Sequence, residues 1–449
     1  MSLPKKFALF LGDILLLYVA LAGALLIRYG VGEFGASFDT HVGPFSKLFL
    51  LWLIVLYIAD LYRPAALRSR AAIWRSLIRV VAIAVVASTV VFYLFGSEFS
   101  LTPKTNLLIF GALFLALDAL WRTTVRSRFA AGAANLIVVG ASPLTAATIA
   151  HLRENPQTGY RVVDWLERPD AAALQTLPAR IAEHRAGMVV FERQTLLNPD
   201  ALAAAYRLLP REVALLTSTD IYETTFERVP LAEIDETWFI RNITTRRRFY
   251  DALKRALDLA ASAILLVVLS PLFLLIALMV GATSRGPVIF RQSRIGKLGR
   301  PFTLYKFRIM VKNHDGSPVT LTNDPRFTGI GKFLNFTHLN ELPQLWNVLR
   351  GDLSLTGPRP ESAELVAQYA SLPYYDIRHV VKPGVTGWAQ INFKPSTSRE
   401  EAFEKLSYDI YYIAHRSLLL DLLIIFRTVK HLVAPVRQNA PADLGGQTR

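Results

Sequence analysis

Long apolar runs dominate the first third of the chain. They lie at residues 7–27, 48–61, 77–96 and 107–121. About 20 apolar residues are needed to cross a bilayer, and the two shorter runs reach that length if their polar flanks lie at the membrane interface. A signal peptide would explain the first run alone, which lacks a small-residue cleavage site before Arg28. The pattern therefore predicts an α-helical membrane bundle of four spans over residues 1–128.

Basic residues are distributed unevenly between the two sides of this predicted bundle. One side would carry Lys5, Lys6, Arg63, Arg68, Arg70, Arg75, Arg122, Arg126 and Arg128, and the other Arg28, Lys47 and Lys104. By the positive-inside rule, the richer side faces the cytoplasm. We therefore expect a multi-pass protein whose N-terminus and whole chain after Arg122 are cytoplasmic.

After the fourth run the pattern changes to short apolar stretches that alternate with helical ones. The segments "NLIVVG", "RVVDWLE" and "AGMVVFE" read as buried strands, and strands alternating with helices predict a parallel α/β sheet. The turn after the first strand keeps Gly140 but lacks the later glycines that let a backbone approach a pyrophosphate. We expect a Rossmann-like module over residues 135–240 with a structural or regulatory role, in preference to a nicotinamide-dependent oxidoreductase.

A fifth apolar run, residues 256–281, is interrupted at its middle by Ser270 and Pro271. Proline removes a helix hydrogen bond and clashes with the preceding turn, so a kink is expected there. Both flanks are basic, and no acidic residue occurs between Arg285 and Lys312. A crossing helix would put one basic flank on the wrong side of the membrane. We predict a re-entrant helix that enters from the cytoplasm, breaks and returns; an ordinary kinked span is the alternative.

Overall composition agrees with a membrane protein and narrows the chemistry. Of the 449 residues 52% are hydrophobic, the mean hydropathy is +0.32, and the formal charge is +15. Because cysteine is absent, disulfides, a thiolate nucleophile and cysteine zinc sites are excluded. Nucleic acid could explain the basic stretch, but no recognised nucleic-acid module accompanies it. Anionic lipid headgroups and substrate phosphates fit it better, and we expect the two to share these residues.

The stretch "THLNELPQLWNVLRGDLSLTGPRPE", residues 337–361, concentrates the candidate chemistry. Its apolar positions follow a helical period, and Pro343 is tolerated in a first turn. Asn340 and Glu341 would then lie at a helix N-terminus, where free N–H groups and the helix dipole favour phosphate. Phosphoryl transfer needs mainly positioning and charge neutralisation, so arginines, a lysine, a metal and one good nucleophile suffice. A plain N-cap role for Asn340 is the structural alternative.

From residue 246 onward the chain resembles the bacterial sugar transferases, the polyprenyl-phosphate glycosyl-1-phosphate transferases, and its layout resembles their large, WbaP-like members. The resemblance is carried, in chain order, by "KRALDLAAS", "LSPLF", "RGPVIFRQSRIGKLGRPFTLYKFRIM", "NDPRFTGIGKFL", "NELPQLWNVLRGDLSLTGPRPE", "VKPGVTGWAQIN" and "DIYYIAHRSLLLDLLII". It implies a mainly helical, α/β-poor catalytic domain over residues 246–437. It also implies transfer of a sugar 1-phosphate from a UDP-sugar to undecaprenyl phosphate with Mg²⁺, releasing UMP. This would be the first membrane step of exopolysaccharide, capsule or O-antigen synthesis at the bacterial inner membrane, and a homo-oligomer stays open.

The resemblance also assigns roles to single residues. In the family the pair at 340–341 is Asp-Glu, and its Asp is the nucleophile that forms a phospho-sugar intermediate and helps to hold the metal. Here Asn340 and Glu341 occupy both the catalytic and the metal positions. The substrate-binding candidates are Arg291, Lys306, Arg308, Asp324, Arg326, Arg359 and Lys382. Gly384 and Gly387 are expected to set turns, and Asp421 to form a buried pair.

Asn340 departs from the family at the position that matters most, because a neutral amide is a poor nucleophile. Three explanations are open: an engineered substitution, natural divergence in which Glu341 or direct attack by the lipid phosphate takes over, or a catalytically inactive relative that acts as a membrane scaffold. His338 and Ile309 also depart from the usual residues. Several nearby changes favour natural divergence, and we expect weak or no activity from the chain as it stands.

Overall fold

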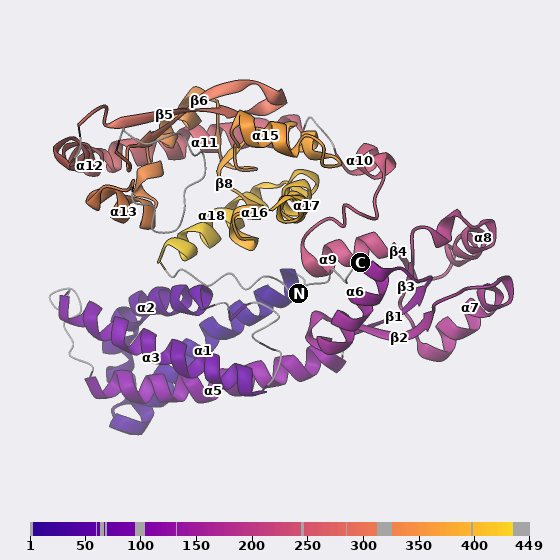
Figure 1. The fold of residues 1–449 in the computed structure, drawn as a ribbon. Helices are drawn as coiled ribbons and strands as arrows, with labels where there is room; N and C mark the ends of the chain where they lie inside the picture. The colour runs from indigo at the N-terminus through magenta and orange to yellow at the C-terminus, as the bar shows by residue number, and fades with distance from the viewer. Residues whose placement is uncertain are drawn as a thin grey trace. The chain divides into compact units, whose positions relative to one another are not determined.

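The protein is described by a computed structural model that covers residues 3–59, 61–62, 67, 70–94, 104–131, 133–243, 247–283, 285–311, 326–396 and 398–433. The chain falls into two compact units, Met1–Ile221 and Tyr222–Arg449. The first unit holds a bundle of long helices and a small parallel sheet, and the second holds the segment that carries Asn340 and Glu341 (Figure 1).

Four long helices open the first unit: α1 (Leu3–Tyr29), α2 (Phe34–Ile58), α3 (Arg70–Leu94) and α5 (Lys104–Ala131). Each contains a stretch of 21 to 25 residues that is long and apolar enough to cross a membrane. The four predicted spans are therefore confirmed as candidate membrane helices. The second of them begins well before the apolar run at residue 48, because His41 and Phe45 of the mixed segment ahead of that run are buried in the bundle.

Side chains from α1, α2 and α5 close the centre of this bundle. Trp52 is fully buried, and its ring lies edge-on to Phe110 with 4.8 Å between the centroids. Arg122 is fully buried as well, and it pairs with Asp13 at 2.8 Å and with Asp118 at 2.9 Å. A charge inside a membrane segment is costly unless it is paired, so this triad ties α5 to α1.

A four-stranded parallel sheet follows the bundle (Figure 1). Its order is β2-β1-β3-β4, and the strands are β1 (Ala134–Val139), β2 (Tyr160–Leu166), β3 (Met188–Phe191) and β4 (Ala214–Thr217). They are joined through α6 (Pro143–Glu154), α7 (Ala171–His184) and α8 (Pro199–Leu208). The three predicted strands and the parallel arrangement are confirmed. The fourth strand is an addition to the three predicted ones; it is as short as β3 and ends in a threonine.

The second unit begins within α9 (Ser218–Phe226) and continues through α10 (Glu236–Asn242). Val229, Trp238 and Phe239 lie in one hydrophobic core with residues 369–424. The stretch from residue 222 to 240, which the sequence assigns to the α/β module, therefore packs with the second unit.

The fifth apolar run forms two helices, α11 (Arg248–Val268) and α12 (Ser270–Thr283), which meet at 63°. The break lies directly before Pro271, so the predicted kink is confirmed. Large apolar side chains of both helices are exposed, among them Ile264, Val267 and Leu274, as on a surface that faces lipid. A bend of this size suits a broken span and a re-entrant helix alike, and re-entry stays a prediction.

The rest of the second unit is mainly helical, as expected, with two small sheets. The strands β5 (Ile289–Ile295) and β6 (Pro301–Phe307) pair antiparallel, and β7 (Ser354–Thr356) and β8 (Gly384–Thr386) pair parallel. The helices are α13 (Gly329–Phe336), α14 (Gln344–Arg350), α15 (Ala363–Tyr369), α16 (Trp388–Asn392), α17 (Arg399–His415) and α18 (Leu418–Val433).

Three glycines allow the backbones around β7 and β8 to touch. A Cβ on Gly384 would lie 2.1 Å from the amide nitrogen of Gly357, and one on Gly387 would lie 2.2 Å from the Gly357 carbonyl oxygen. Neither glycine has the positive φ of a left-handed turn. The prediction that Gly384 and Gly387 set turns is therefore wrong, because close backbone approach is what excludes a side chain at both positions.

Candidate functional site

Asn340 and Glu341 lie in a short 3₁₀ turn, η5 (Leu339–Glu341), immediately before α14. The chain enters this turn through His338, whose φ of 57° is left-handed. The α-helix begins at Gln344, and Pro343 is its N-cap, a place where a missing N–H costs nothing. The pair thus lies just ahead of the N-terminus of α14, in a 3₁₀ turn of its own.

The side chain of Asn340 is buried without a hydrogen-bond partner for its oxygen. Asn340 is 4% exposed, and among the described residues nothing donates to its Oδ1. The N-cap positions of η5 and α14 belong to His338 and Pro343, so the plain N-cap role for Asn340 is wrong. A buried polar atom left unsatisfied costs about 1–3 kcal/mol, and a ligand contact at Oδ1 would recover that cost.

Glu341 is the centre of a cluster of charges. Its Oε1 accepts hydrogen bonds from Lys306 Nζ at 2.9 Å and from Arg359 Nη2 at 3.1 Å. Arg294 interacts electrostatically with both Arg359 and Glu341. We call these four residues the Glu341 cluster. Its three cations and one carboxylate leave a positive excess that suits a phosphate or diphosphate.

The protonation equilibria in this cluster follow from burial and charge together. Burial alone would raise the pKa of the Glu341 carboxyl, but Arg359 and Lys306 outweigh it and hold that pKa well below its usual range. Burial lowers the pKa of Lys306, Arg359 lowers it further, and Glu341 counteracts both. Both cations, Lys306 and Arg359, would therefore attract an anion that enters the cluster. That anion would compete with Glu341 for them.

Strand geometry decides which basic residues of β5 and β6 belong to the cluster. In the antiparallel register Lys306 stands opposite Phe290, and Arg294 stands opposite Phe302. Side chains of a strand alternate between faces, so Lys306 and Arg294 share a face while Arg291 points to the other. The structure thus brings Lys306 to the predicted site and leaves Arg291 away from that face.

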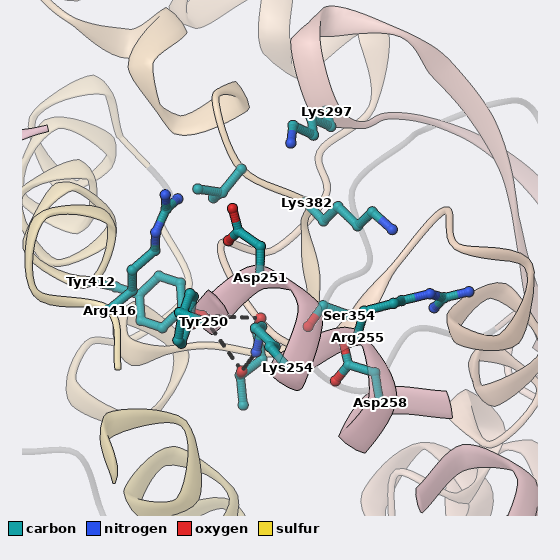
Figure 2. Close-up of a pocket in the computed structure, with 12 residues that line it drawn as sticks. Tyr250, Asp251, Lys254, Arg255, Asp258, Lys297, Ser354, Lys382, Tyr412 and Arg416 are labelled. Carbon is teal, nitrogen blue, oxygen red and sulfur yellow. Dashed lines mark hydrogen bonds between the residues drawn. The ribbon is translucent and has the colours of Figure 1, made fainter. Parts of the chain in front are cut away.

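The remaining predicted substrate-binding residues are dispersed. Arg308 is buried and donates from Nη1 to the carbonyl oxygen of Arg285 at 3.1 Å, which is a structural contact. Arg326 lies at a turn where its carbonyl oxygen accepts the N–H of Val311, and Asp324 lies outside the described residues. Lys382 lines a separate basic cavity (Figure 2).

A second charged network supports Arg359 from behind. Arg378, 4% exposed, pairs with Glu361 and Asp409 at 2.9 Å each and donates to the carbonyl oxygen of Arg359 at 3.0 Å. Lys405 adds a second cation to Glu361 at 2.8 Å. Sequence reasoning missed this network because its members come from distant segments. The position of Glu361, two residues after Arg359, was the one signal available.

The oxygen atoms of residues 340 and 341 could supply part of the ligand shell of Mg²⁺. Mg²⁺ prefers oxygen ligands, keeps several waters and commonly completes its shell with substrate phosphates. The Oδ1 atom of Asn340 is an unpartnered oxygen, and the next residue in the chain, Glu341, carries a carboxylate. The part of the chain that the structure describes contains no group of three or more His, Asp or Glu side chains able to hold a metal. These residues fit a cation shared with a substrate, and they do not form a closed protein site.

The α/β module fills the place where a Rossmann pyrophosphate would lie. A Cβ on Gly140 would be 2.2 Å from Thr195 Oγ1. The buried carboxylate of Glu192 accepts the N–H groups of Gln194 and Thr195 at 2.8 and 2.7 Å, and the indole of Trp165 donates to the Gly140 carbonyl at 2.9 Å. The carboxyl end of β1 is closed by these side chains, which argues against a nicotinamide cofactor there.

Comparison with known proteins agrees with this division of the chain. The model of the bacterial sugar transferase family matches residues 249–435, and a model described as a CoA-binding domain matches residues 57–188. The first covers the Glu341 cluster, the basic cavity and the broken helix. The second covers parts of the helical bundle and of the parallel sheet.

Three relatives illustrate the similarity. The UDP-N-acetylgalactosamine-undecaprenyl-phosphate N-acetylgalactosaminephosphotransferase of Aeromonas hydrophila is 34% identical over 283 residues, 62% of this chain and 64% of that protein. The UDP-glucose:undecaprenyl-phosphate glucose-1-phosphate transferase of Klebsiella pneumoniae is 49% identical over 181 residues, 39% of each chain. The uncharacterized sugar transferase EpsL of Bacillus subtilis is 43% identical over 185 residues, 40% of this chain and 87% of that protein.

The alignments cover less than two thirds of the first two relatives and most of the third. The family model over residues 249–435 contains the segment that carries the Glu341 cluster. The motifs, the cluster of cations around a buried carboxylate and these alignments lead to one conclusion: the chain belongs to the bacterial sugar transferase family.

Proposed function

We propose that the protein transfers a sugar 1-phosphate from a UDP-sugar to undecaprenyl phosphate. The observation that carries the proposal is the Glu341 cluster, in which Lys306 and Arg359 converge on one buried carboxylate. The preceding residue, Asn340, has an unpartnered buried oxygen. In the transfer, an oxygen of the lipid phosphate forms a bond to the sugar-bearing phosphorus of the UDP-sugar, the bond between that phosphorus and the bridging oxygen breaks, and UMP leaves with the bridging oxygen. Lys306 and Arg359 would hold the diphosphate and neutralise its charge.

The route that best fits these residues is direct attack by the lipid phosphate. Asn340 carries no charge, and Glu341 is held ionised by two cations that share its Oε1. A carboxylate in such ion pairs is a weakened nucleophile, so Glu341 serves to hold Lys306 and Arg359 in place. Asn340 and Glu341 would supply oxygen ligands to Mg²⁺, which when bound would neutralise charge on the phosphate oxygens.

Membrane attachment at the bacterial inner membrane completes the proposal. Besides the four candidate spans, α18 exposes Leu419, Leu422 and Phe426 on one side and buries Asp421 and Ile424 on the other. Such a two-faced helix suits the membrane interface. We place the second unit on the cytoplasmic side, with α11 and α12 as a re-entrant pair.

The test is a transfer assay with the full chain in lipid nanodiscs. A labelled UDP-sugar and undecaprenyl phosphate are supplied with Mg²⁺, and lipid-linked product and UMP are followed in parallel. Equal amounts of both products support the proposal. UMP without lipid-linked product would indicate hydrolysis, and neither product with any of several UDP-sugars would favour an inactive membrane scaffold.

A further inference from the structure

A second basic cavity, whose lining is drawn in Figure 2, shares no residue with the Glu341 cluster. It measures about 130 Å³, several times the room that one buried water needs. The two sites are linked by short segments: Lys297 follows Arg294 by three residues, and Thr356 precedes Arg359 by three. Three residues span at most about 11 Å, so the linked walls of the two sites are close.

One face of α11 forms a wall of the cavity. Asp251, Lys254, Arg255 and Asp258 recur at the spacing of helical turns and all line it. Figure 2 shows this face together with Lys382, which comes from a different segment. The cavity thus lies between the first turns of α11, a helix that exposes apolar residues further along, and the strand β7, which belongs to one of the predicted substrate motifs.

The charge in the cavity is positive. Its lining holds five cationic side chains and two carboxylates, namely Lys254, Arg255, Lys297, Lys382, Arg416, Asp251 and Asp258. Lys254 is paired with Asp421 at 3.1 Å, which confirms the predicted buried pairing of Asp421. Among the residues that the structure describes, no carboxylate lies within 4.0 Å of the amino group of Lys297 or Lys382.

Lys382 lies near other cations of the cavity. Burial lowers the pKa of Lys382, and Arg255 and Lys297 lower it further, while Asp258 and Asp352 act in the opposite direction. The amino groups of Lys382 and Arg255 also crowd Gly351, where an added Cβ would lie 3.5 and 3.3 Å from them. An anion between these side chains would relieve their mutual repulsion.

A buried hydroxyl adds a neutral donor to the cavity. Ser354 is 1% exposed, lines the cavity, and its Oγ has no hydrogen-bond partner among the described residues. The neighbouring hydroxyl of Thr356 is already used by Asp421 at 2.6 Å. Ser354 therefore offers an O–H to a ligand, where an apolar ligand would leave it unsatisfied.

We infer that this cavity is a second phosphate-binding site, in which Lys297, Lys382 and the Ser354 hydroxyl hold a phosphate group of roughly two negative charges. Inorganic phosphate and the phosphate monoester of a membrane lipid share this chemistry. A direct displacement requires donor and acceptor phosphates to be bound at the same time, and a separate site meets that need. This last step rests on the proposed transfer, whereas phosphate binding in the cavity does not.

The test is a binding measurement without any UDP-sugar, so that its outcome does not depend on transfer. Inorganic phosphate is titrated into the full chain in phosphatidylcholine nanodiscs, and binding is followed by calorimetry and by protection of Lys297 and Lys382 from amine labelling, read by mass spectrometry. We expect saturable binding that protects both lysines and leaves the exposed Lys332 unprotected. Lys382→Gln should weaken binding about tenfold or more, and Ser354→Ala several-fold.

Matched variants separate this site from the Glu341 cluster. Lys382→Arg should retain binding, and Arg300→Gln, which removes an exposed cation near Lys297 that does not line the cavity, should leave it unchanged. Farnesyl phosphate and UMP serve as competitors: displacement by the first assigns the site to a lipid phosphate, and displacement by the second to a soluble one. The absence of saturable binding, or binding that survives Lys382→Gln and disappears in Lys306→Gln, would overturn the inference.

Discussion

Arg378 donates a hydrogen bond from Nη2 to the main-chain carbonyl oxygen of Arg359 at 3.0 Å. The same guanidinium is buried between Glu361 and Asp409. The side chain of Arg359 reaches Glu341. The buried Arg378 therefore fixes the backbone of Arg359, a member of the Glu341 cluster. Arg378 is therefore a positioning residue.

Replacing Arg378 should separate this positioning role from stability. Arg378→Met leaves Asp409 buried without its cation and should cost about 3–5 kcal/mol in the free energy of unfolding. Arg378→Lys keeps a charge near Asp409 but loses the fork that reaches Arg359, so we expect a smaller loss of stability with a clear fall in kcat. Thermal unfolding in detergent and transfer kinetics measure the two effects. Full kcat in Arg378→Lys would show that the bond to Arg359 is dispensable.

Asn340→Asp should raise transfer activity. The substitution restores a charged oxygen at the buried position before Glu341, and the neighbouring Glu341 cluster has an excess of positive charge. We expect a gain of about 10²-fold or more, the scale of one group that acts in the transition state. The comparison uses initial rates of the two proteins at equal reconstituted amounts, with Asn340→Ala as the control that lacks an oxygen. His338 and Ile309 also differ from the usual family residues. If such changes have inactivated the site, neither variant will show transfer activity.

Glu341 and Lys306 should be energetically coupled. Their ion pair is largely buried, with side chains 14% and 15% exposed. Removing Glu341 takes the carboxylate partner from Lys306, and removing Lys306 leaves Glu341 with Arg359 as its remaining cation. A double-mutant cycle with Glu341→Gln and Lys306→Met should give a coupling energy in unfolding of about 0.5–3 kcal/mol. Glu341→Gln should also abolish whatever transfer the starting protein shows, since Lys306 and Arg359 lose their common anchor. Additive effects on stability together with unchanged turnover would remove Glu341 from the proposed site.

The re-entrant arrangement of α11 and α12 predicts one-sided accessibility. Single cysteines at Arg248 and at Arg300 flank the bent pair, and the natural chain has no cysteine to interfere. Both should react with a membrane-impermeant thiol reagent in inside-out vesicles and remain unreactive in intact spheroplasts. Cysteine at Gly32, in the loop between the first two spans, is the control with the opposite pattern. Labelling of the Arg300 position from outside would establish a crossing span.

His379 should make stability depend on pH in mildly acidic solution. Burial, with Arg378 beside it, lowers the pKa of His379 to about 4, whereas an unfolded histidine titrates near about 6.5. Between these values the unfolded state binds more protons, so the free energy of unfolding falls as the pH is lowered through the window and is untouched by this residue above it. His379→Gln should flatten that slope in denaturation measured between about pH 7 and pH 4. Parallel curves for the two proteins would contradict the assignment.

The sequence by itself determined the elements and the family. Continuous apolar runs require helices long enough for a bilayer, alternating strands and helices require a parallel sheet, and Pro271 requires a break, because each of these is a local consequence of side-chain polarity or backbone chemistry. The family motifs likewise lie along contiguous stretches. The fourth strand and the true start of α14 escaped prediction, since β4 is short and ends in Thr217, and the helix begins only after Pro343.

The tertiary structure decided which charges meet. Lys306 and Arg291 look equivalent in a basic stretch, but strand alternation and the register of β5 against β6 send them to opposite faces. Glu341 recruits Lys306 and Arg359 from segments 35 and 18 residues away, and Lys382 joins α11 in a separate cavity. Ion pairing and burial act between residues that are close in space, and separation along the chain does not reveal which residues those are. The members of the site are therefore determined only by the packing of the strands, turns and helices.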